Sequence, residues 1–189
     1  LFIDADYTGT VVLCPETLAY LKKYKRVGLY ASVQFVNKLE HIKKQLQEQN
    51  ITIITSKADR TNAVSQLLGC DNLHNSLNLS EEQVAEVECY LYIGDGKFHP
   101  LALVYAQKDL ITKKEVICND PIQNKMSLLG EKEVEIILNK FKSSLMKFWT
   151  VHKIGVIITI KPGQEQLKLA LLLETKFPEK KFYYFIDNN

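Results

Sequence analysis

The fold of this chain is decided by RVGLYASVQFVNKLEHIKKQLQEQNITIIT, which runs from Arg26 to Thr55. It opens with a nearly continuous apolar run, residues 26–33, which has the length and composition of a parallel strand buried on both faces. Apolar residues then recur at helical spacing through residues 33–49, opposite a basic and amide-rich face. Residues 51–55 form a second apolar run. The stretch therefore predicts a strand–helix–strand unit.

The same alternation continues along the chain. Residues 87–93 and the EVICNDP segment at residues 115–121 predict two more strands, with a short helix over residues 98–107 between them. A turn is expected around Ser80 and Glu81. Because the connections are too long for hairpins, we expect an α/β fold with a parallel β-sheet and helices on both faces, a Rossmann-like three-layer arrangement.

A second unit of the same kind follows a polar segment, residues 122–130, which we interpret as irregular and as a domain boundary. After it the pattern predicts a long helix over 131–152, a strand beginning at IGVIITI, a helix over 164–176 and a strand at KFYYFID. We therefore predict tandem similar domains, the first at residues 1–126 and an incomplete second at 127–189.

Composition narrows the class of protein. With 46% hydrophobic residues among 189, the chain can bury a core, and 24 basic against 22 acidic side chains give no electrostatic case for nucleic acid or an anionic membrane. No apolar run approaches the roughly 20 residues of a membrane span. We expect a soluble, cytoplasmic protein. Because its ends, Leu1 and Asn189, adjoin expected β segments, we expect it to be part of a longer polypeptide.

The four cysteines are Cys14, Cys70, Cys89 and Cys118. They are widely spaced and contain no CxxC pair, which argues against a zinc finger or a self-contained ferredoxin motif. Three of them lie in apolar segments, where a cysteine usually acts as a small buried hydrophobe. Cys70 differs, because it follows Gly69 in a polar loop that is approached through Arg60, and positive charge favours a thiolate.

A second loop, within YLYIGDGKFHPLAL at residues 90–103, closes an expected strand. Gly94 and Gly96 permit positive φ angles and close approach of a ligand. Asp95 offers an acceptor and His99 a donor. The loop matches neither a dinucleotide fingerprint nor a Walker loop, and spacing alone also fits a plain strand-to-helix turn.

Other candidate ligand contacts are Gln34 at the end of the first strand, Gln66 before Cys70, and the KPGQ turn. That turn contributes Lys161, Gly163 and Gln164. Its place at a helix start, with unpaired backbone amides, favours a carboxylate. No nucleophile set of serine, histidine and aspartate is visible.

Together, SQLLGCD, YIGDGKFHPLAL and KIGVIITIKPGQEQLKLA resemble the diphthamide synthase family, the archaeal-type 2-(3-amino-3-carboxypropyl)histidine synthases. The similarity covers nearly the whole chain in order. Ser65, and the pair Thr159 and Ile160, depart from the family pattern. Members carry three cysteines, one from each of three similar domains, that hold a 4Fe-4S cluster, and only the middle one has a match here, at Cys70. The resemblance implies the middle domain and the start of the third.

The resemblance also implies a function. Such an enzyme transfers the 3-amino-3-carboxypropyl group of S-adenosylmethionine to a histidine of translation elongation factor two by radical chemistry, the first step of diphthamide biosynthesis. Cys70 would be a cluster ligand, and the loops after the strands would contact substrate. The expected substrate-binding residues are Gln34, Gln66, Gly94, Asp95, Gly96, His99, Lys161, Gly163 and Gln164. An electron donor and a homodimer, or a heterodimer with a paralogue, are the implied partners.

Two alternatives stay open at this point. The chain could belong to a non-catalytic partner subunit of that enzyme, or it could be a metal-free α/β module that binds a nucleotide or sugar. As an isolated fragment we expect it to be inactive.

Overall fold

The computed structural model describes residues 6–69, 76–160 and 166–187. The chain divides into two compact units, Leu1–Leu138 and Asn139–Asn189. Among the described residues, no helix is both long and apolar enough to cross a membrane.

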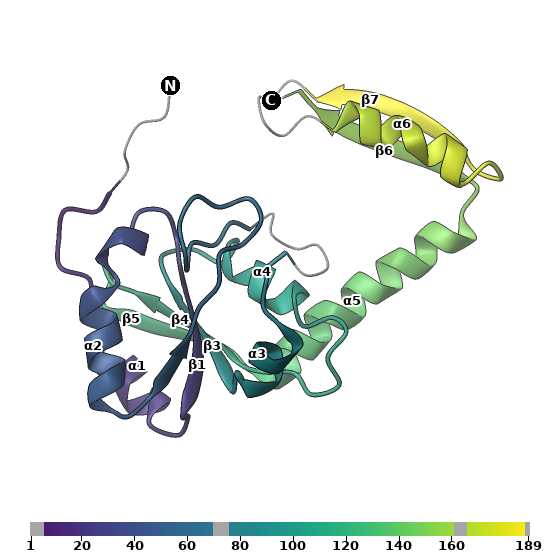
Figure 1. Cartoon of the computed structure of the whole chain (residues 1–189). Helices are drawn as coiled ribbons and strands as arrows, with labels where there is room; N and C mark the ends of the chain where they lie inside the picture. Colours follow the sequence, from purple (N-terminus) through teal and green to yellow (C-terminus); the bar gives the residue numbers. More distant parts are fainter. Residues whose placement is uncertain (1–5, 70–75, 161–165, 188–189) are drawn as a thin grey trace. The chain divides into compact units, whose positions relative to one another are not determined.

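The first unit contains a five-stranded sheet (Figure 1). Its strands are β1 (Arg26–Ala31), β2 (Thr52–Ile54), β3 (Cys89–Ile93), β4 (Val116–Asp120) and β5 (Lys125–Leu129). They lie in the order β2-β1-β3-β4-β5, in which the first four are parallel and β5 pairs antiparallel with β4. The expected mostly parallel α/β sheet is therefore confirmed.

Helices cover both faces of this sheet. The helical elements of the unit are α1 (Pro15–Leu21), η1 (Val36–Lys38), α2 (Glu40–Glu48), α3 (Glu81–Glu86), α4 (Pro100–Tyr105) and the first turns of α5 (Glu131–Thr150). Buried side chains of α1 and α2 form one core cluster with one face of the strands, and those of α4 and the start of α5 form a second cluster with the other face. The three predicted layers are present.

Alternation along the central strands explains the two clusters. Leu29 and Leu91 belong to the first cluster, whereas Tyr30, Tyr90 and Tyr92 belong to the second. Successive side chains of a strand point to opposite faces, so a strand covered on both sides must be apolar throughout. This requirement accounts for the continuous apolar runs in the sequence.

Two sequence predictions are wrong. The segment expected to be irregular, residues 122–130, contains β5, which pairs with β4 from Val116↔Leu129 to Asp120↔Lys125. The turn expected at Ser80 and Glu81 is instead the start of α3, because the Ser80 hydroxyl accepts a hydrogen bond from the Gln83 amide in a capping box. The predicted boundary after residue 126 therefore falls inside a strand.

The second unit repeats the strand–helix–strand pattern on a smaller scale. Strands β6 (Lys153–Thr159) and β7 (Lys181–Asp187) are parallel, and α6 (Leu167–Lys176) connects them. The predicted order of elements is confirmed. Assignment of the two units to the middle and third domains of the family stays a prediction.

Candidate functional site at the carboxyl edge of the sheet

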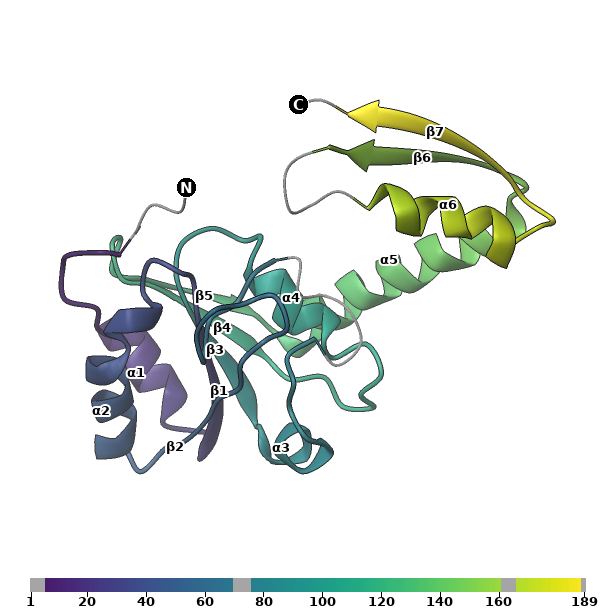
Figure 2. The same cartoon turned by 45° about the horizontal axis from the view of Figure 1, so that its top comes forward.

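The loops that follow β1 and β3 begin at the same edge of the sheet (Figure 2). The Ser32 amide donates a hydrogen bond to the Ile93 carbonyl at 3.0 Å, and the Gly94 amide donates one to the Asn119 carbonyl at 3.0 Å. Pairing therefore continues one residue past each strand and fixes the positions where the loops depart. Open parallel sheets bind their ligands at this edge.

The loop that leads to Cys70 is attached to the end of β1. Gln66 forms an isolated bridge with Ala31, whose amide donates to the Ser65 carbonyl at 2.7 Å. The buried Gln66 side chain accepts hydrogen bonds from the amides of Asn62 and Ala63 at 3.0 and 3.1 Å. Its side-chain oxygen thus stabilises the loop backbone, and the expected contact of Gln66 with substrate stays a prediction.

This loop meets the Gly94–His99 turn. The Gly69 amide donates a hydrogen bond to His99 Nδ1 at 2.8 Å. The Phe98 ring lies against Gly69, where a Cβ atom would come within 2.2 Å of the ring. Only glycine fits beneath the ring in this arrangement. The structure therefore brings together the two loops that the sequence singled out, up to the residue before Cys70.

Glycines at the turn serve different purposes. Gly96 has a φ of 70°, a conformation that favours glycine. Gly94 provides space, because a Cβ atom there would lie 2.6 Å from the Tyr92 hydroxyl. Asp95 and Gly96 are exposed, and His99 is half-buried directly before α4. The turn is thus open to a ligand on its outer side.

Two buried hydroxyls at this edge were missed by sequence reasoning. Ser32 and Tyr92 are 6% and 0% exposed, and neither hydroxyl has a hydrogen-bond partner in the part of the chain that the structure describes. Burial raises the pKa of the Tyr92 phenol, the Asp95 carboxylate adds to the rise, and the neighbouring Ser32 side chain works against it. The signal in the sequence that could have indicated them is a tyrosine, Tyr92, two residues before a glycine, Gly94, at the end of a strand.

The remaining expected contacts are less defined. Gln34 is half-buried in the turn after β1, and its carbonyl accepts a hydrogen bond from the Tyr7 amide at 3.0 Å. Cys70 and the KPGQ residues Lys161, Gly163 and Gln164 lie outside the described residues. Their assigned roles stay predictions.

The described cysteines do not suit a metal. Cys14, Cys89 and Cys118 are buried, as expected for small hydrophobes. Burial raises the pKa of Cys89, and it raises that of Cys118 to about 11, so both thiols stay protonated at neutral pH. No group of three potential metal ligands occurs within the described ranges. An iron–sulfur cluster would therefore depend on Cys70 and on ligands beyond these residues.

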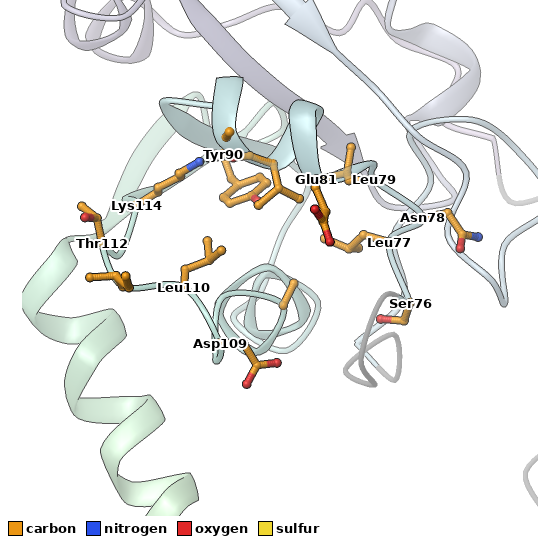
Figure 3. Close-up of a pocket in the computed structure, with 14 residues that line it drawn as sticks. Ser76, Leu77, Asn78, Leu79, Glu81, Tyr90, Asp109, Leu110, Thr112 and Lys114 are labelled. Atoms are coloured by element: carbon orange, nitrogen blue, oxygen red, sulfur yellow. Dashed lines mark hydrogen bonds between the residues drawn. The ribbon is translucent and has the colours of Figure 1, made fainter.

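A pocket of about 530 Å³ lies elsewhere in the first unit (Figure 3). Its lining includes Leu77, Leu110 and Tyr90, together with Lys114 just before β4. Tyr90 occupies the beginning of β3, whereas the expected site follows the end of that strand. None of the described residues expected to bind substrate lines this pocket.

A mostly parallel open sheet with paired loops at its carboxyl edge defines an open α/β protein, a class whose members bind ligands at strand ends. The chain belongs to the family described as putative diphthamide synthesis proteins, which it matches over residues 1–187.

Two curated relatives carry the name 2-(3-amino-3-carboxypropyl)histidine synthase, which describes a transferase. The protein from Pyrococcus horikoshii is 29% identical over 173 residues, or 90% of this chain and 46% of the relative. That from Methanocaldococcus jannaschii is 25% identical over 142 residues, or 74% of this chain and 32% of the relative. The chain thus spans less than half the length of these relatives.

Solved structures support the fold. Crystal structures of Dph2 from Pyrococcus horikoshii, one of them described with a 4Fe-4S cluster, match with a TM-score of 0.67 at 24% identity. Each match covers 92% of this chain and 48% of the other. At this identity the similarity is evidence for the fold alone.

Proposed function

We propose that this chain is part of a radical-type iron–sulfur transferase. The whole enzyme would move the 3-amino-3-carboxypropyl group of S-adenosylmethionine to a histidine of translation elongation factor two, the first step of diphthamide biosynthesis. Family membership supports the reaction. The observation that carries the site is the hydrogen bond from Gly69 to His99, because it joins the loop leading to Cys70 to the glycine-rich turn.

Within this proposal, Cys70 is one ligand of a 4Fe-4S cluster and the other ligands come from the rest of the full-length protein. The bound cluster would supply the electron that cleaves a carbon–sulfur bond of the substrate. The residues of this chain would shape the pocket. Gly94 to His99 would form one wall, while Gln34 and the KPGQ turn would contact the substrate from other strand ends.

The proposal includes partners and a location. The protein substrate would be elongation factor two, reduction would require an electron donor, and the enzyme would work as a homodimer or as a heterodimer with a paralogue. A protein that modifies a translation factor would act in the cytoplasm. The low net charge of +2 suits recognition of a protein surface without a strongly basic nucleic-acid face.

The test is anaerobic iron–sulfur reconstitution of the full-length protein, followed by transfer of labelled substrate to elongation factor two. We expect iron uptake and transfer in the wild type, loss of both in Cys70→Ala, and retention of both in the control Cys118→Ala. Iron uptake that does not need Cys70 would contradict the metal assignment. Cys70-dependent uptake without transfer, in the presence of a reductant, would instead indicate the non-catalytic subunit.

A further inference from the structure

Two hydroxyls lie side by side at the carboxyl edge of the sheet. The Ser32 amide pairs with the Ile93 carbonyl, so Ser32 lies beside Gly94 and shares a sheet face with Gly94 and Tyr92. Both hydroxyl oxygens are buried, and neither has a hydrogen-bond partner among the described residues. Ser32 lowers the pKa of Tyr92 as a hydrogen-bonding neighbour does, so the only described partner within reach of either hydroxyl is the other one.

Within the described ranges, the buried side-chain polar atoms without a partner are those of Ser32, Gln49 and Tyr92. Tyr30, which belongs to the same core cluster as Tyr92, bonds the Ser56 hydroxyl at 2.7 Å, and Ser56 in turn donates to the Leu77 carbonyl. The buried Tyr30 hydroxyl thus has a partner outside the pair that Ser32 and Tyr92 form. A buried polar group without a partner costs free energy. Even a bond between Ser32 and Tyr92 would leave one hydroxyl hydrogen without an acceptor.

The surroundings connect these hydroxyls to the expected site. Gly94 packs directly against the Tyr92 hydroxyl, which lies 2.6 Å from the position of the missing Cβ, so a larger residue at 94 would displace the hydroxyl. The Tyr92 and His99 rings are 6.5 Å apart between centroids, and His99 holds the Gly69 amide. The two hydroxyls therefore lie next to the turn that the proposed pocket uses.

The polar groups of Ser32, Tyr92 and Asp95 complement one kind of ligand. Burial and the Asp95 carboxylate raise the pKa of Tyr92, so the phenol keeps its proton at neutral pH and acts as a donor. Asp95 is exposed, and its carboxylate is a hydrogen-bond acceptor. Two donors next to a carboxylate complement a zwitterion, since the donors suit a carboxylate and the Asp95 carboxylate suits an ammonium. The 3-amino-3-carboxypropyl end of S-adenosylmethionine carries both charges.

We propose that Ser32, Tyr92 and Asp95 form the subsite for the amino-acid end of S-adenosylmethionine, in which the two hydroxyls donate to its carboxylate. This inference rests on the proposed function and specifies how the site holds the transferred group. It assigns binding roles to Ser32 and Tyr92, which the sequence did not single out.

The test compares two ligands on the full-length, anaerobically reconstituted protein. Equilibrium dialysis would measure S-adenosylmethionine and its decarboxylated analogue, which keeps the ammonium but lacks the carboxylate. We expect Tyr92→Phe to weaken binding of S-adenosylmethionine about tenfold, the effect of one hydrogen bond to a charged group, and to leave the analogue unchanged. Ser32→Ala should act in the same direction. Tyr90→Phe, on the same strand and face, is the matched control.

Thermal unfolding separates binding from a structural role. Because the Tyr92 hydroxyl has no described partner, Tyr92→Phe should leave the Tm unchanged or raise it. A lowered Tm together with equal losses for both ligands would overturn the inference, as would unchanged affinity for S-adenosylmethionine. If the wild type bound S-adenosylmethionine but the variants did not differ from it, the proposed function would stand without this subsite. A wild type that does not bind S-adenosylmethionine would overturn both.

Discussion

Gly69 and His99 are 30 positions apart in the sequence, with α3 and β3 between them, yet the Gly69 amide donates a hydrogen bond to His99 Nδ1 at 2.8 Å. Because Nδ1 accepts, the neutral imidazole carries its proton on Nε2. The same histidine precedes Pro100, the first residue of α4, which fixes its backbone. A rigid helix start thus orders the loop that leads to Cys70.

Replacing His99 by alanine should loosen that loop. The Gly69 amide loses its acceptor, which costs about 1 kcal/mol. We expect faster hydrogen exchange at the Gly69 amide and reduced iron uptake in the full-length protein. His99→Asn should restore part of the protection, because Asn Oδ1 occupies nearly the position of Nδ1, whereas the exposed His41→Ala serves as control. Equal exchange rates in wild type and His99→Ala would contradict the role of this bond.

Replacing Gly69 by alanine should destabilise the first unit through its contact with Phe98. The new Cβ would lie 2.2 Å from the ring of Phe98, which is 65% exposed and can turn aside, so we expect a loss of about 0.5–1.5 kcal/mol, the cost of an off-rotamer side chain. Phe98→Ala removes the obstacle, so the double variant should be no less stable than Phe98→Ala alone. Chemical denaturation of all four proteins gives the coupling free energy. Additive effects would show that the ring does not cause the loss.

Much of the fold was predictable because the central strands are buried on both faces, which leaves a clear sequence signature. The meeting of the loops around Gly69 and Gly94 was also predictable, since parallel strands bring their carboxyl ends to one edge. Strand β5 was not, because KMSLL reads as a polar, mixed segment with largely exposed side chains, and its pairing with β4 and the packing of Met126 and Leu129 against the core appear only in three dimensions.

The site was predicted less completely than the fold. The sequence predicted that Gln66 contacts the ligand, but its side-chain oxygen accepts hydrogen bonds from the amides of Asn62 and Ala63. Ser32 and Tyr92 looked like ordinary strand residues, and only three-dimensional packing shows that their buried hydroxyls have no hydrogen-bond partner elsewhere in the described part of the chain. The alternation of residues along a strand predicts which face of the sheet a side chain occupies. It does not predict whether the polar atom of that side chain finds a hydrogen-bond partner there.

Glu115 should contribute stability that depends on pH. Its carboxylate accepts hydrogen bonds from the Tyr20 hydroxyl at 2.9 Å, from Lys23 at 3.0 Å and from the Tyr24 hydroxyl. Burial alone would raise the pKa of Glu115, but the hydrogen bonds from Tyr24, Lys23 and Tyr20 outweigh it and lower that pKa. A lowered folded-state pKa stabilises the protein above the unfolded value, and that stability is lost as the pH falls through the folded value.

We therefore expect Glu115→Gln to cost about 1–2 kcal/mol in the free energy of unfolding at pH 7. The difference from wild type should shrink as the pH falls below the ordinary value of 4.5. Denaturation curves between pH 7 and 3 would measure it, with the exposed Glu48→Gln as the control. A difference that stays constant across this range would exclude the ionised carboxylate as its source.

Lys180 should stabilise the second unit as a cap on the end of α5. Its ammonium donates hydrogen bonds to the Trp149 carbonyl at 3.0 Å and to the Val151 carbonyl at 2.8 Å, and the residue is only 8% exposed. Carbonyls at a helix end have no partner within the helix and favour a cation. Lys180→Met keeps most of the side-chain volume but removes the donors, so we expect a loss of about 1–3 kcal/mol.

The loss should be local, because Lys180 and both carbonyls belong to the second unit. Native-state hydrogen exchange measures the opening free energy of β6 and β7 separately from that of the first unit. Lys181→Met is the matched control, since its side chain is exposed on the adjacent residue. We expect faster exchange in β6 and β7 for Lys180→Met alone. Similar exchange in the two variants would show that the cap does not stabilise the unit.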